Sequence, residues 1–140
     1  NGLLGAEAVL AFDPALAERL AYARKQSTQL ASKMRFLAAQ FVAYLEDELW
    51  RRLAGQANAM AARLAAAVAD LPNLEFVRPV ETNQLFPRLP RAAIAPLQAR
   101  FPFYVWQAQE NVARWVTSFD TTAEDIDGYA AAVRATLTGT

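Results

Sequence analysis

The chain has 140 residues, of which 54% are apolar and 20% charged, and its formal net charge is zero. This composition is typical of one globular domain rather than of a disordered or fibrous chain. The balanced charge and a pI near 6.5 argue against a protein that wraps nucleic acid or lies on an anionic membrane, because both need clustered positive charge. One weak basic cluster remains, formed by Arg24, Lys25, Lys33 and Arg35.

The sequence contains neither cysteine nor histidine. It therefore has no disulfide, no thiolate nucleophile and no cysteine-bound metal, which fits a reducing compartment such as the cytoplasm. Without histidine, serine–histidine hydrolysis and imidazole base catalysis are excluded within this chain, and we expect no metal site. Any chemistry carried by the chain must use other residue types.

The first predicted element is a short apolar strand over residues 7–12. Asp13 and Pro14 then form a typical helix start, an N-cap followed by proline at the first helical position. The strand has no sequential partner, and an isolated strand leaves its backbone groups unpaired. We therefore expect it to join a sheet formed by residues outside this chain. The opening pair Asn1 and Gly2, typical of a turn, also suggests a piece of a longer protein.

Residues 30–71 are predicted to be helical almost throughout, with a break near residues 44–47. In the second half, apolar residues recur every three or four positions, which places them on one stripe of a helix. The stripe consists of Leu49, Leu53, Ala57, Met60, Leu64, Val68 and Leu71. Pro72 and Asn73 end the helix.

After residue 73 the predicted order is strand, strand, helix, strand, strand, helix. The ranges are 74–80, 83–89, 91–100, 103–107, 113–119 and a last helix from about residue 122. Pro87 cannot donate to a ladder, so we expect its strand at an edge or a bulge. Thr121 and Glu124 have the spacing of a capping box. The last helix is expected to turn these residues inward: Ile126, Tyr129, Val133 and Leu137.

This order predicts an α+β fold, in which a compact sheet carries helices on one face. The long helices that precede the sheet must pack on something else.

Arg114 is unusual because it lies inside the apolar strand 113–119. Burying an unpaired guanidinium costs several kcal/mol, so Arg114 either points to water or meets an anion. A surface arginine on the open face of the sheet is the simpler alternative.

Other conspicuous residues have simpler interpretations. Four aromatic residues of the two late strands could form a substrate platform, but core packing is the more usual role. They are Phe103, Tyr104, Trp106 and Trp115. Trp50 on the long helix is expected to make a packing or subunit contact. The acidic residues 46–48 and 124–125 lie at helix starts and are interpreted as solvated caps.

Four segments together resemble one enzyme family, the low-specificity L-threonine aldolases. They are "RKQSTQLASKMRFLAAQF" (24–41), "GQANAMAARLA" (55–65), "VETNQLFPRLP" (80–90) and "ARWVTSFDTTAEDID" (113–127). These aldolases are pyridoxal 5'-phosphate (PLP) enzymes of fold type I, the aminotransferase-like fold, in the β-eliminating lyase group. The resemblance covers essentially the whole chain, in family order.

The resemblance implies a fold and a place in a larger protein. Residues 1–29 would end the large PLP-binding domain with one strand and a helix, and residues 30–71 would be interdomain and oligomerisation helices. Residues 72–140 would be the small carboxyl-terminal α+β domain, with an antiparallel-rich sheet. The Schiff-base lysine would lie just before Asn1, so no catalytic residue is expected within this chain.

The resemblance also implies binding residues. Arg114 matches the family arginine that binds the substrate carboxylate, and an arginine offers two parallel donors for that task. Lys25 matches a lysine that reaches the cofactor phosphate of the neighbouring subunit, although it could simply be a solvated lysine near a helix end. Ser32 stands where many relatives have a second phosphate-directed arginine, and Lys33 or Arg35 could replace it.

The function implied is PLP-dependent cleavage of β-hydroxy-α-amino acids, such as threonine or phenylserine, to glycine and an aldehyde. A cytoplasmic homodimer or homotetramer is expected, without nucleic acid or membrane partners. Two alternatives remain open, because a fold does not fix a reaction. One is another PLP lyase or transaminase-like enzyme, and the other is a non-enzymatic α+β oligomerisation module.

Overall fold

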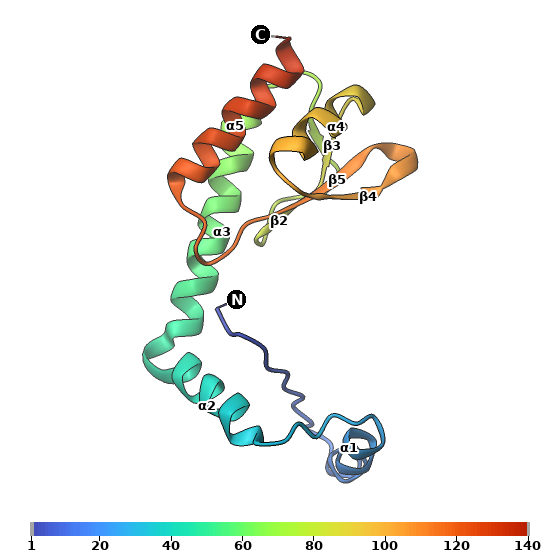
Figure 1. Ribbon diagram of the computed structural model, residues 1–140, viewed down its shortest axis with the longest axis vertical. Helices are drawn as coiled ribbons and strands as arrows, with labels where there is room; N and C mark the ends of the chain where they lie inside the picture. The colour runs from blue at the N-terminus through green and yellow to red at the C-terminus, as the bar shows by residue number, and fades with distance from the viewer. Residues whose placement is uncertain (1, 140) are drawn as a thin grey trace. The chain divides into compact units, whose positions relative to one another are not determined.

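The computed structural model describes residues 2–139 and separates them into two compact units (Figure 1). One unit is Gly2–Trp50 and the other begins at Arg51. Asn1, to which the prediction of a preceding lysine refers, lies outside the described residues. The division into residues 1–29, 30–71 and 72–140 stays a prediction.

The first unit contains α1 (Pro14–Gln26) and α2 (Met34–Leu45). The predicted start of α1 is confirmed: a side-chain oxygen of Asp13 accepts a hydrogen bond from the N–H of Ala15 at 2.9 Å. Residues 7–12 form no strand within the described residues and are almost all exposed, so their expected pairing with a sheet outside this chain stays a prediction. A strand needs a neighbouring strand to pair with its backbone, and the described residues supply none for this segment.

The predicted helix break is confirmed. A short 3₁₀ turn, η1 (Glu46–Glu48), separates α2 from the long helix α3 (Leu49–Val68). Asp47 and Glu48 have φ angles of 47° and 54°, in the left-handed region that an α-helix does not use. The acidic residues 46–48 are exposed, as their interpretation as solvated residues requires.

The sheet belongs to the second unit and is antiparallel in every pairing. Its five strands are short and run in the order β1-β3-β5-β2, with β4 also paired to β5. Their bounds are β1 (Glu75–Phe76), β2 (Gln84–Leu85), β3 (Pro87–Arg88), β4 (Tyr104–Gln107) and β5 (Val112–Val116). Strand β5 therefore pairs with three neighbours and is the centre of the sheet.

Pro87 was expected at an edge or a bulge, and of these two places the edge is wrong. It begins β3, and β3 lies between β1 and β5. The ladder along residues 83–89 is interrupted at Phe86, between β2 and β3. Proline is tolerated there because the first residue of a strand can do without a donated hydrogen bond.

Helix α4 (Arg91–Arg100) has the predicted bounds, and α5 (Ala123–Thr138) ends the described chain. The capping box of α5 lies one residue later than predicted: Thr122 and Asp125 bond reciprocally. Thr121 instead accepts a hydrogen bond from the N–H of Ser118 at 2.8 Å, which shapes the turn before the helix. The sequence pattern cannot tell which of the two adjacent threonines is the N-cap, because that depends on the path of the turn before the helix.

Helices α3, α4 and α5 share one core with the sheet. The predicted stripe of α3 turns inward, with Leu64 and Val68 at most 2% exposed, and α5 contributes Ile126 and Val133 as predicted. Helices α3 and α5 run side by side (Figure 1), where Arg63 pairs with Asp127. In the described chain, no helix is both long enough and apolar enough to span a membrane.

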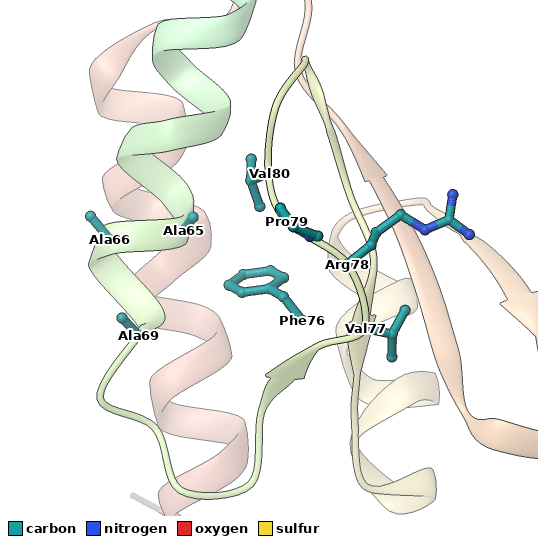
Figure 2. Close-up of a pocket in the computed structure, with 8 residues that line it drawn as sticks. All are labelled: Ala65, Ala66, Ala69, Phe76, Val77, Arg78, Pro79 and Val80. Carbon is teal, nitrogen blue, oxygen red and sulfur yellow. The ribbon is translucent and has the colours of Figure 1, made fainter.

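Residues 76–80, from the end of β1 into the loop before β2, line a groove with α3. Phe76, Pro79 and Val80 turn toward the alanines of the helix, whereas Arg78 points the other way (Figure 2). Leu74, Phe76 and Val80 are partly buried against the core. The groove they line with α3 is apolar, while the side of the sheet that Arg78 faces is cationic and aromatic.

Candidate functional site

Strand β5 carries its side chains alternately to two faces, as any strand does. Ala113, Trp115 and Thr117 turn into the core and are at most 4% exposed. Arg114, half-buried, and Val116, 51% exposed, turn to the opposite face. Arg114 therefore lies on the open face of the sheet, on its central strand.

Arg114 has two contacts on that face. Its Nε donates a hydrogen bond to Oε1 of Gln84 at 2.9 Å. Gln84 lies on the neighbouring strand β2, where it pairs with Val116 and so shares the face of Arg114. On the other side, the guanidinium carbon lies 5.7 Å from the ring centroid of Trp106 in β4, within the range of a cation–π contact.

No carboxylate neutralises Arg114 within residues 2–139. By contrast, other arginines of the same unit, Arg63, Arg88 and Arg134 among them, have acidic partners. Arg88 is hydrogen-bonded to Glu110 and Glu75, and these partners raise the pKa of its guanidinium. The charge of Arg114 thus remains available to an external anion.

The aromatic residues divide between the two faces. Core packing is confirmed for Trp115, which is 3% exposed and contacts Phe103 edge to face at 6.3 Å. It is wrong for Tyr104 and Trp106, which are 75% and 52% exposed on β4. Because β4 pairs only with β5, its side chains receive little cover, and sequence alternation alone could not reveal that.

Aromatic and cationic groups form a row on the open face. The guanidinium carbon of Arg78 lies 4.2 Å from the ring centroid of Phe86, and the Phe86 ring contacts Trp106 at 5.7 Å. Trp106 in turn lies beside Arg114. Like Arg114, Arg78 has no acidic partner among the described residues. The open face therefore favours anions.

Two buried polar atoms on the other side of the sheet have no hydrogen-bond partner in the described part of the chain, Nε1 of Trp115 and the hydroxyl of Tyr129. Their rings meet edge to face with centroids 5.0 Å apart. Burial raises the pKa of Tyr129, so its hydroxyl stays protonated. Trp115 belongs to the buried core and Tyr129 packs against it, so this cluster is a part of the core.

The predicted phosphate-binding residues belong to the first unit and are all exposed. Lys25 is the penultimate residue of α1, Lys33 precedes α2 with a φ angle of 57°, and Arg35 lies in the first turn of α2. Within residues 2–139 none of the three has an acidic partner. Free cations of this kind fit the dianionic phosphate of a cofactor such as PLP.

Sequence reasoning missed Gln84 and misassigned Trp106 at this site. Gln84 sits in "TNQLF" as one polar residue among several, and only its register with β5 brings it to Arg114. A signal was present in the alternation of Gln84 with buried Leu85, which places the two on opposite faces. This alternation shows that Gln84 lies near Arg114 only once the pairing of β2 with β5 is known.

The architecture defines a class of protein. A small antiparallel sheet covered by helices on one face, preceded by long helices, is the carboxyl-terminal part of a fold type I domain. A solved structure of threonine aldolase from Leishmania major is similar to 84% of this chain with a TM-score of 0.76 and 27% identity, and the chain covers 35% of it.

Sequence comparison specifies the family. The chain is 44% identical over 135 residues to a low-specificity L-threonine aldolase of Pseudomonas aeruginosa, and 41% identical over 138 residues to one from another Pseudomonas strain. These matches include 96% and 98% of this chain but only 39% and 40% of the relatives. The resemblance to the low-specificity L-threonine aldolases is thus confirmed, for a chain that spans about two fifths of their length. No family model matches the chain.

Proposed function

We propose that this chain supplies the carboxylate clamp of a PLP-dependent aldolase that splits β-hydroxy-α-amino acids into glycine and an aldehyde. The names of the similar enzymes support the reaction. The observation that carries the role of this chain is Arg114, a guanidinium without an acidic partner in the described residues, held on the open face of the sheet.

Arg114 suits an α-carboxylate for two reasons. Its planar group offers parallel N–H donors that match the two carboxylate oxygens, and its positive charge attracts them. Binding of the carboxylate by Arg114 would fix the orientation of the groups around Cα of the amino acid. The residue thereby selects which bond at Cα is presented for cleavage, so the clamp serves orientation as well as affinity.

The cofactor would be held from the other unit. Lys25, with Lys33 or Arg35, would bind its phosphate in a neighbouring subunit, which makes the active protein at least a dimer. When bound, PLP withdraws electrons from the Cα of the amino acid. The lysine that holds it covalently would come from residues upstream of this chain in the longer protein.

Another PLP lyase or a transaminase-like enzyme could use the same clamp, and a non-enzymatic module would use none. Visible absorbance of the purified full-length protein separates enzyme from module, because bound PLP is yellow. Release of acetaldehyde from threonine, compared with formation of a keto acid, separates an aldolase from a transaminase.

Replacement of Arg114 tests the clamp. In the full-length protein, Arg114→Ala should lose about 1.5–3 kcal/mol of carboxylate binding, which is about ten- to hundredfold in glycine affinity and in kcat/KM. Arg114→Lys should recover little, since an ammonium lacks the planar pair of donors. Glycine affinity is measured by titration of the cofactor absorbance, with thermal stability in parallel.

Arg91→Ala is the control, because Arg91 is an exposed arginine at the start of α4. It should leave glycine binding unchanged. Normal glycine binding by Arg114→Ala, accompanied by a lower melting temperature, would show that Arg114 has a structural role and that the proposal is wrong.

Lys25→Ala tests the phosphate contact separately. Loss of a charged donor should weaken PLP retention, measured by dialysis and absorbance, while the oligomeric state is unchanged. The neighbouring Gln26→Ala is the control, since Gln26 is equally exposed at the end of α1. Unchanged retention in the Lys25 variant would leave Lys25 as a solvated helix-end residue.

A further inference from the structure

Uncharged groups hold Arg114 from two sides. Oε1 of Gln84 accepts its Nε–H at 2.9 Å, and the ring of Trp106 lies beside the guanidinium carbon at 5.7 Å. The two residues belong to β2 and β4, which both pair with β5. Arg114 is therefore oriented by side chains from the strands paired with its own.

This arrangement leaves the far edge of the guanidinium available. With Nε occupied by Gln84, the terminal nitrogens Nη1 and Nη2 make no hydrogen bond to any residue that the structure describes. These two nitrogens form the end-on fork that binds a carboxylate through two parallel bonds. The hydrogen bond at Nε determines where that fork points.

Gln84 is neutral, unlike the partners of Arg88 on the same sheet. Arg88 pairs with Glu75 at 2.6 Å and with Glu110 at 3.2 Å, so two carboxylates compensate its charge. A glutamate at position 84 would reach Arg114 in the same way. A carboxamide orients the guanidinium through one oxygen but leaves its charge uncompensated.

We propose that Gln84 is a positioning residue of the substrate carboxylate clamp: its neutral oxygen aims the fork of Arg114 while leaving the full positive charge to the amino acid. Trp106 supports the guanidinium from the opposite side. The inference rests on the proposed function of Arg114 and adds that the identity of residue 84 sets the affinity for the carboxylate.

The test uses two variants of the full-length holoenzyme. Gln84→Glu keeps the shape and adds a charge, whereas Gln84→Met keeps the length and removes the acceptor. A carboxylate at position 84 would share the guanidinium with the substrate carboxylate and repel it, which should weaken glycine binding on the order of ten- to hundredfold. Loss of one orienting hydrogen bond should weaken binding about three- to tenfold. KM for threonine should follow glycine affinity, and kcat should change less.

Gln109→Glu is the matched control, because it makes the same charge change at an exposed position in the turn between β4 and β5. It should bind glycine as the wild type does. Trp106→Ala should also weaken glycine binding, and Trp106→Phe, which keeps an aromatic face, should restore most of it. A structural role alone would lower the melting temperatures without this order of affinities.

Two results separate failure of the inference from failure of the proposed function. If Arg114→Ala binds glycine normally, the clamp itself is wrong. If Arg114→Ala loses binding but Gln84→Glu binds glycine as tightly as the wild type, the clamp stands and the role of Gln84 is overturned.

Discussion

The two units differ in what holds them together. The unit that begins at Arg51 surrounds a core of residues at most a few per cent exposed, contributed by three helices and the sheet. In Gly2–Trp50, helices α1 and α2 contain no buried residue, and Phe12 is 95% exposed. Both regions have well-formed helices, so the comparison shows that helix signals specify local structure while burial decides independent stability.

Dividing the chain is the strongest test of this comparison. Residues 51–140 alone should unfold cooperatively and protect their core amides from hydrogen exchange, because their apolar contacts lie within the unit. Residues 1–50 alone should show little protection, since short helices without tertiary burial are marginal in water. Thermal circular dichroism and exchange measurements on the two pieces check this. Cooperative unfolding of residues 1–50 would contradict the distinction.

A matched pair of leucines measures the difference at single residues. Leu64 is 2% exposed in α3, whereas Leu16 is 50% exposed in α1. Within this chain, Leu64→Ala should reduce the free energy of unfolding by about 2–5 kcal/mol through lost burial and an internal cavity. Leu16→Ala should change it by no more than about 0.5 kcal/mol. Urea unfolding of both variants measures the two changes. Equal losses of unfolding free energy would contradict the difference between the two units.

A smaller effect is expected at the junction of helix and sheet in the second unit. The buried hydroxyl of Thr117, which is 4% exposed, donates a hydrogen bond to the carbonyl of Ala57 in α3 at 2.7 Å. Thr117→Val should cost about 1–3 kcal/mol, because that carbonyl loses its side-chain donor in a dry site. In the control Thr136→Val, the lost bond lies within α5 and is half-buried, so a smaller loss in urea unfolding is expected.

The smallest effect is a pH dependence confined to surface carboxylates of the second unit. Hydrogen bonds from Arg134, from Thr122 and from Arg63 lower the pKa values of Asp70, Asp125 and Asp127 respectively. A carboxylate whose pKa is lower in the folded state stabilises the fold above its unfolded pKa and loses that contribution as the pH falls through the folded value.

The stability of residues 51–140 should therefore decline as the pH is lowered past the ordinary aspartate range. Asp127→Asn removes one of these groups, so the melting temperatures of wild type and variant should approach each other between pH 7 and pH 3. A constant difference between the two melting temperatures over this interval would show that the ion pair with Arg63 makes no pH-dependent contribution to stability.

Much of this protein was determined by the sequence alone. Asp13 and Pro14 start α1, the spacing of Leu64 and Val68 identifies the buried side of α3, and the bounds of α4 follow from local signals. Such features depend on residues a few positions apart, whose caps and periodicities can be read directly. Arg114 was recognisable in the same way, as a charge inside an apolar strand.

The tertiary structure decided which side chains meet across strands. It placed Pro87 inside the sheet, moved the capping box to Thr122, and left Trp106 exposed beside Arg114. It also brought Gln84 to Arg114 across 30 positions of sequence. Register between distant strands depends on the packing of the whole core, so no local pattern contains it. For that reason the sequence could predict the arginine of the candidate site, whereas only the fold could reveal that Gln84 is the residue that orients it.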